Sequence, residues 1–165
     1  HDGEDGYVAI LTIPSLDYSS FAFSLDFKAV DYPSQNTIVT GGTSYRWISY
    51  RRTDAGELEL SLNNGRFSHT YENTSLGVDS WHSIMSSVDL DNKVVRTALD
   101  GVVLGEVPLA SDFALNIIGS GSESYDREFT FTKYSNGSAF FGYADNLKVY
   151  EQALSQQDLE YLVSK

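Results

Sequence analysis

One short segment combines aromatic rings with guanidinium groups: residues 45–52, Tyr-Arg-Trp-Ile-Ser-Tyr-Arg-Arg. Aromatic faces stack on the apolar faces of sugar rings, and an arginine fork holds a carboxylate or sulfate through parallel hydrogen bonds. In an extended strand, Tyr45, Trp47 and Arg51 share one face and Arg46 lies on the other. We therefore predict a glycan site at Tyr45, Arg46, Trp47 and Arg51. The alternative is structural: Trp47 fills the core and the arginines pair with nearby glutamates.

Two further groups of residues are candidate ligand contacts. Tyr125 and Arg127 follow the glycine- and serine-rich run 119–122, which predicts a loop at the edge of a sheet, and Tyr134 lies at the next turn. His69 and Tyr71 alternate along one predicted strand and are expected to line a concave sheet face. For each of these residues the alternative is an ordinary surface position.

Asp145 is the carboxylate that best supports a metal-binding hypothesis. Strand alternation places it on the same face as Leu147 and Val149, and a carboxylate buried there must be paired, hydrogen-bonded or metal-bound. The acidic, glycine-rich run 2–6 could supply further oxygen ligands, which calcium prefers. The hypothesis is a structural calcium held by Asp145, Asp2, Glu4 and Asp5. The alternatives are a salt bridge at Asp145 and a solvated run at 2–6.

Period-two alternation of apolar and polar residues predicts the strands that must position these side chains. The segments with strand signals are 21–27, 57–62, 66–71, 81–90, 93–99, 102–104, 113–118, 128–134 and 145–150. Residues 63–65, 91–92 and 100–101 supply turns, because Asn, Asp and Gly tolerate positive φ. Short strands at this spacing, with no helical repeat, indicate a single all-β sandwich or barrel domain over residues 1–165.

One short helix is predicted near the C-terminal end of the sequence. Ser155 and Asp158 have the spacing of a capping box, and Leu154 and Leu159 are placed as a hydrophobic staple. Leu159 and Leu162 are expected to pack this helix back onto the strands. We interpret the helix as structural.

The composition excludes several classes of function. With a net charge of -12 over 165 residues the chain repels polyanions, so nucleic acid and anionic membrane surfaces are not expected partners. The absence of cysteine excludes disulfides, thiol catalysis and cysteine-ligated zinc. The sequence contains no run of about 18 apolar residues, the length that a membrane-spanning helix needs. The 11 Tyr, 9 Phe and 2 Trp residues suit sheets and contact surfaces.

Three segments match one known pattern in order and spacing over nearly the whole chain. They are 21–27, then Trp81-His82-Ser83-Ile84 with residues 99–103, and finally 141–150 followed by Ala153-Leu154-Ser155. Together they resemble the laminin-G-like, concanavalin A-like family. The resemblance implies a two-sheet antiparallel jelly-roll sandwich with Trp81 packed in the core. Leu99 and Ala144 depart from the family's usual aromatic residue and isoleucine.

The resemblance also implies a range of functions. Relatives include carbohydrate-binding modules beside glycosidases, lectin domains of sialidases and adhesive modules, and many carry a structural calcium. We expect a non-catalytic module that binds polysaccharide, excised from a larger secreted enzyme or surface protein. The alternative is an adhesion or spacer module that contacts protein.

A glycosidase is the third class, and we expect no enzymatic activity. Such an enzyme needs two carboxylates about 5–10 Å apart. Glu57 and Glu59 have acid-x-acid spacing, but the Glu-x-Asp-x-x-Glu pattern of glucanases is absent. The sequence also lacks a Gly-x-Ser-x-Gly elbow, a glycine-rich phosphate loop and a His-Glu-x-x-His site. Its histidines, His1, His69 and His82, are too scattered to suggest a zinc triad.

Overall fold

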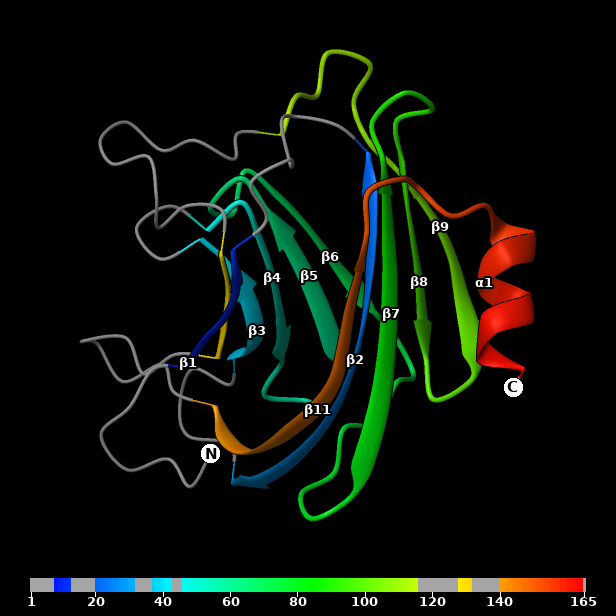
Figure 1. Cartoon of the computed structure of the whole chain (residues 1–165). Coiled ribbons are helices and arrows are strands. Elements are labelled where there is room, and N and C mark those ends of the chain that lie inside the picture. Colours follow the sequence, from blue (N-terminus) through cyan, green and yellow to red (C-terminus); the bar gives the residue numbers. More distant parts are fainter. Residues whose placement is uncertain are drawn as a thin grey trace. The chain divides into compact units, whose positions relative to one another are not determined.

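The computed structural model describes residues 8–12, 20–31, 37–42, 46–115, 128–131 and 140–164 (Figure 1). The chain divides into two compact units. Unit 1 comprises His1–Pro14, Lys28–Ser80 and Leu115–Tyr143, and unit 2 comprises Ser15–Phe27, Trp81–Ala114 and Ala144–Lys165. The expectation of one domain over residues 1–165 stays a prediction.

Strands dominate the described part of the chain, as the alternation predicts. They are β1 (Val8–Thr12), β2 (Phe21–Asp31), β3 (Thr37–Gly41), β4 (Ile48–Arg52), β5 (Leu58–Leu62), β6 (Phe67–Tyr71), β7 (Trp81–Asp89), β8 (Val94–Leu99), β9 (Val102–Pro108), β10 (Glu128–Phe131) and β11 (Phe141–Tyr150). One sheet has the order β1-β10-β3-β4-β5-β6 and the other the order β11-β2-β7-β8-β9. Two antiparallel sheets and one short helix, α1 (Gln156–Val163), confirm the expected all-β jelly-roll class.

The β5–β6 hairpin in unit 1 shows how local sequence fixes register. Leu58, Leu60 and Leu62 are buried, whereas the residues between them are only half-buried. Asn63, Asn64 and Gly65 all have positive φ, which aligns Leu62 with Phe67 and Leu58 with Tyr71. The predicted turn is confirmed, and with it the assignment of every side chain in β5 to one of two faces.

In unit 2, β7, β8 and β9 form a meander with tight turns. Ile84 pairs with Leu99 and Asp89 with Val94, and Asp100 and Gly101 turn the chain with φ of 50° and 81°. β9 continues to Pro108, beyond the predicted end at residue 104. The strand predicted over 113–118 is wrong in its described part, because residues 113–115 have no strand structure.

Helix α1 begins as its capping box predicts. The Ser155 side chain accepts a hydrogen bond from the backbone N–H of Asp158, and the Asp158 carboxylate accepts one from the Ser155 backbone N–H. Figure 1 shows the helix beside β9. Leu154 and Leu159 pack with Ala22 of β2 and Ala98 of β8, so α1 covers part of one face of the five-stranded sheet. No helix in the described part of the chain is long and apolar enough to cross a membrane.

Candidate functional site

A polar groove of about 280 Å³ lies on the six-stranded sheet, within unit 1. Strands β3 to β6 contribute hydroxyl, guanidinium and carboxylate groups to it, and the β5–β6 turn contributes an amide. The lining residues are Thr37, Arg46, Ser49, Arg51, Glu59, Ser61, Asn64, Gly65 and Ser68. The lining thus carries two guanidinium groups and one carboxylate, a net charge of +1 in a chain of net charge -12.

Strand register places the groove's side chains in rows across the sheet. Ser49 pairs with Ser61, and Ser61 with Ser68, so three hydroxyls stand side by side on three strands. The next row contains Arg51 opposite Glu59. Because side chains alternate between faces, these residues lie opposite the buried Ile48, Leu60 and Leu62. The groove is therefore the polar face of an amphipathic sheet.

Arg51 and Glu59 form a two-point ion pair in this groove. Nε of Arg51 donates to Oε1 of Glu59 at 2.9 Å, and Nη2 donates to Oε2 at 3.1 Å. The Arg51 side chain is 52% exposed and that of Glu59 13%. Glu59 orients the guanidinium through Nε and Nη2, and the N–H groups of Nη1 take no part in the pair. The neighbouring Arg52 has a structural role, since its Nε donates to the backbone oxygen of Leu76 at 2.9 Å.

Arg46 also lines the groove, contrary to its predicted place on the face opposite Arg51. Strand β4 begins only at Ile48, and Trp47 occupies a bend before it. The backbone carbonyls of Arg46 and Trp47 accept hydrogen bonds from Asn64 and Asn63, which tie this bend to the β5–β6 turn. Strand alternation therefore does not extend through Arg46 and Trp47, and the faces predicted for these two residues are wrong.

Trp47 is fully buried, so its ring is not available to stack on a sugar. It makes an edge-to-face contact with Phe129, with ring centroids 5.2 Å apart. A Cβ at Gly41 would overlap the indole, which shows how closely the ring packs on that strand. The prediction of Trp47 as a ligand contact is wrong, and for this residue the structural alternative, a place in the core, holds.

His69 and Tyr71 lie on the opposite face of the sheet from the groove, so the structure does not bring them together with Arg46 and Arg51, and their role as ligand contacts stays a prediction. Leu60 pairs with His69 and Leu58 with Tyr71, so both aromatic rings belong to the buried leucine face. The two rings contact each other edge to face at 4.7 Å. Ser68 takes the groove position in this strand instead. The physical reason is the two-residue period of a strand.

Several predicted site residues lie outside the described residues. They are Tyr45, Tyr125, Arg127 and Tyr134 among the ligand contacts, and Asp2, Glu4 and Asp5 among the metal ligands. Asp145 is described and is exposed, not partly buried as expected. Asn146 follows it with φ of 53°, which interrupts the alternation that would have buried the carboxylate. Among the described residues no group of three acidic, histidine or cysteine side chains is arranged to hold a metal ion, and the calcium hypothesis stays a prediction.

Trp81 is 54% exposed, although the sequence pattern predicted a core position. It is the first residue of β7, and the buried residues of that strand begin with His82 on the other face. Sequence reasoning also missed Thr37, Ser61, Asn64 and Ser68 in the groove. The sequence could have indicated Ser61, because it is one of the polar positions in the alternating segment 57–62.

The chain belongs to the concanavalin A-like lectin/glucanases superfamily, whose family model matches residues 2–160. This is the family that the sequence pattern suggested, and the two antiparallel sheets agree with it. No curated protein matches the sequence of the chain.

Solved structures show the same fold at low sequence identity. The binding domain of Paraclostridial mosquitocidal protein 1 matches with a TM-score of 0.70 and 13% identity, over 98% of this chain and 41% of that one. Domain 4 of AbnA, an arabinanase from Geobacillus stearothermophilus, matches with a TM-score of 0.64 and 19% identity, over 99% and 79%. The CBM40 of a Ruminococcus gnavus sialidase matches with a TM-score of 0.60 and 16% identity, over 88% and 83%. The chain spans less than half of several of the chains it matches.

Proposed function

We propose that this chain is a non-catalytic carbohydrate-binding module that holds a glycan in the polar groove of the six-stranded sheet. The observation that supports the proposal best is the groove itself. Hydroxyls from Ser49, Ser61 and Ser68 stand in one row next to the oriented guanidinium of Arg51. Sugar hydroxyls need fixed donors and acceptors, and rigid strands supply both without a loop having to order on binding.

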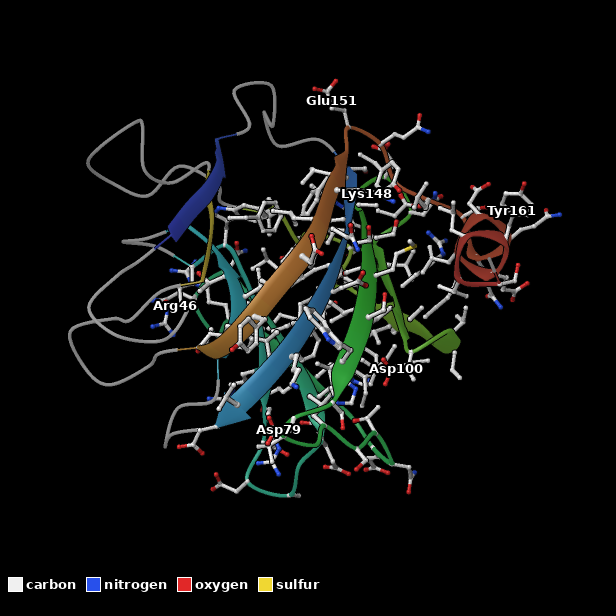
Figure 2. All side chains as sticks on the ribbon, turned by 60° about the horizontal axis from the view of Figure 1, so that its bottom comes forward. Arg46, Asp79, Asp100, Lys148, Glu151 and Tyr161 are labelled. Carbon is white, nitrogen blue, oxygen red and sulfur yellow. The ribbon has the colours of Figure 1, made fainter. Side chains whose placement is uncertain are left out.

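The charge of the groove favours an acidic sugar. Arg46 and Arg51 outnumber Glu59, and guanidinium forks bind carboxylate or sulfate groups with directional hydrogen bonds. A uronate or sialate could use the N–H groups of Arg51 that point away from Glu59. Figure 2 shows the Arg46 side chain, which comes from the segment before β4. We therefore expect acidic glycans to bind more tightly than neutral ones.

Two of the structural relatives are consistent with this proposal. Domain 4 of AbnA was solved in complex with arabinotriose, and the Ruminococcus gnavus CBM40 was solved bound to α2,3-sialyllactose. Both are parts of glycosidases, which fits a module that raises the local concentration of polysaccharide around a catalytic partner. Attachment to such a partner and an extracellular location are parts of the proposal.

Binding measurements on groove variants test the proposal. We expect Arg46→Gln and Arg51→Gln each to weaken binding of sialyllactose or oligogalacturonate about tenfold, because each loses a charged hydrogen-bond donor. Arg66→Gln is the matched control, since Arg66 is exposed near the same hairpin but does not line the groove. Circular dichroism melts confirm that all three variants fold.

Two outcomes would replace the proposal with another class of function. A glycan array that shows no binding to any acidic or neutral glycan favours the adhesion or spacer module. Glycan turnover that Glu59→Gln abolishes makes the chain a glycosidase. In the structure Glu57 accepts a hydrogen bond from the Asn73 backbone N–H at 3.2 Å and Glu59 pairs with Arg51, so each carboxylate has a structural partner.

The structural calcium is a separate part of the proposal. Its ligands would be Asp145, which is exposed, and the acidic run containing Asp2, Glu4 and Asp5. Calcium that binds the folded state and not the unfolded state stabilises the fold, so added calcium should raise the melting temperature and a chelator should lower it. Identical melts under both conditions count against the site.

A further inference from the structure

A second pocket, of about 390 Å³, lies within unit 2 on the five-stranded sheet. Its lining combines one exposed indole with four carboxylate or amide side chains, one hydroxyl and one imidazole. The lining residues are Asp26, Trp81, His82, Ser83, Asp100, Asp145 and Asn146. They come from β11, β2, β7 and the β8–β9 turn. The polar groove on the other sheet shares none of them.

Trp81 is the apolar element of this pocket. More than half of its surface is exposed, although a chain buries most of its large aromatic residues. The chain's other tryptophan, Trp47, is fully buried. An exposed indole in a pocket offers a flat face for the C–H groups of a sugar ring, while the hydroxyls of the same ring need polar partners at the rim.

The carboxylates at the rim are held in place by hydrogen bonds. Asn146 donates from its side chain to Oδ2 of Asp26 and from its backbone N–H to Oδ1 of Asp145, both at 2.7 Å. Asn146 makes both contacts from a left-handed backbone conformation, with φ of 53°. Oδ1 of Asp26 and Oδ2 of Asp145 take no part in these two hydrogen bonds. They remain acceptors for the hydroxyl groups of a ligand.

Asp100 is fixed from a different side. Its Oδ1 accepts from the backbone N–H of Ser83 and its Oδ2 accepts from Nδ1 of His82, both at 2.8 Å. The His82 ring is buried and lies 5.5 Å from the ring of Phe27. Figure 2 shows Asp100 next to the end of β7. His82 is therefore a positioning residue, and Asp100 presents an oriented carboxylate to the pocket.

From this arrangement we infer a second saccharide site, in which a sugar ring without acidic groups stacks on Trp81 and donates hydroxyl hydrogen bonds to Asp26, Asp100 and Asp145. The lining holds three carboxylates and no lysine or arginine, so it repels uronate and sialate. The two sites thus differ in charge, and the chain could hold acidic and neutral parts of a polysaccharide separately. The inference shares with the proposed function only the class of ligand.

Tryptophan fluorescence offers a direct measurement, because Trp81 is accessible to acrylamide and Trp47 is buried. The probes are neutral oligomers of glucan, xylan, mannan, galactan and arabinan, with oligogalacturonate as the acidic comparison. At least one neutral oligomer should protect Trp81 from quenching, and oligogalacturonate should not. Trp81→Phe should remove the part of the fluorescence that acrylamide quenches, which assigns that part to Trp81. Measurements in calcium and in chelator keep the result independent of the metal.

Calorimetry on variants completes the test. Trp81→Ala should weaken the neutral oligomer at least about tenfold, and Trp81→Phe less, because it keeps a smaller ring. Tyr161→Ala is the matched control, since Tyr161 is 57% exposed on α1 and does not line the pocket. Figure 2 shows Tyr161 on this helix. Asp26→Asn tests a rim carboxylate in a variant that keeps the size of the side chain.

The inference is overturned if no neutral oligomer protects Trp81, or if oligogalacturonate protects it equally well. It is also overturned if tetramethylammonium competes as strongly as the sugar, which would make the pocket a cation site. Arg51→Gln separates the two sites. If neutral binding at Trp81 survives in that variant while acidic binding is lost, both proposals stand. Acidic binding that survives in Arg51→Gln contradicts the proposed groove site, and neutral binding that is lost contradicts the Trp81 site.

Discussion

The indole of Trp47 occupies the space where a Cβ of residue 41 would stand, so the ring fits only because that residue is Gly41. This contact joins β3 to the bend that precedes β4. It fixes the ring in the interior, beside Phe129. The same contact decides that Arg46, and not Trp47, reaches the polar groove.

Gly41→Ala should destabilise the protein by roughly 2–4 kcal/mol, because the new methyl group forces the indole out of its packed position. Chemical denaturation measures the free energy of unfolding. Gly77→Ala is the control: a Cβ there meets nothing nearer than Ser80 Oγ at 3.9 Å, and the change should stay within about 0.5 kcal/mol. Equal effects of the two substitutions would contradict the packing argument.

Removing Glu59 should strengthen the binding of acidic glycans. Glu59→Gln frees the Arg51 fork and raises the groove's net charge from +1 to +2, so we expect a several-fold rise in affinity. The effect on stability should stay below about 1 kcal/mol, because Arg51 is more than half exposed and solvent screens the pair. Isothermal titration with oligogalacturonate measures the affinity. A fall in affinity would show that Glu59 itself contacts the glycan.

Asp89 should make the stability of the protein fall in acid. Burial by itself raises the pKa of Asp89, but hydrogen bonds from Asn92 and Arg96 and the charge of Arg96 outweigh it and hold the pKa below its ordinary value. A lowered pKa means that the contribution is complete above the unfolded value and is lost as the pH falls through the folded value.

Urea unfolding of the wild type and of Asp89→Asn, as a function of pH, tests this. The variant should lose about 1–3 kcal/mol at neutral pH, since Arg96 is left with one fewer carboxylate. The difference between the two proteins should begin to shrink below about pH 4, the pKa of an unfolded aspartate, and should go on shrinking as the pH falls through the lowered pKa of Asp89 in the folded protein. A difference that does not change with pH would mean that Asp89 acts through packing alone.

Asp100 combines a conformational role with a hydrogen-bonding one. It adopts φ of 50° in the turn before β9, and its carboxylate accepts from Ser83 and His82. Asp100→Ala should cost about 2–3 kcal/mol, because alanine disfavours positive φ and leaves Nδ1 of His82 without its acceptor. Asp100→Asn should cost less than half of this, since asparagine tolerates the turn and keeps one acceptor oxygen. Thermal melts rank the two variants.

Much of the fold could be predicted because it depends on contacts between residues close in sequence. Alternation in 21–27 and 57–62 assigns each residue to a face, and the left-handed turns at 63–65 and 100–101 need only Asn, Asp and Gly. The capping box at Ser155 and Asp158 is likewise confirmed. The membership in the concanavalin A-like superfamily follows from the same patterns taken in order.

The candidate sites depend on where strands begin and on which residues meet across the sheets, and the sequence by itself determined neither. Strand β4 begins only at Ile48, after a bend at Trp47, so Trp47 is buried and Arg46 lines the groove. Asn146 and Asp26 are separated by 120 positions in the chain. Only the pairing of β11 with β2 brings Nδ2 of Asn146 within 2.7 Å of Oδ2 of Asp26. The sequence therefore determined the elements and their polar faces through local backbone preferences. Tertiary structure decided which aromatic ring stays exposed, because burial depends on the neighbours that packing brings to each position.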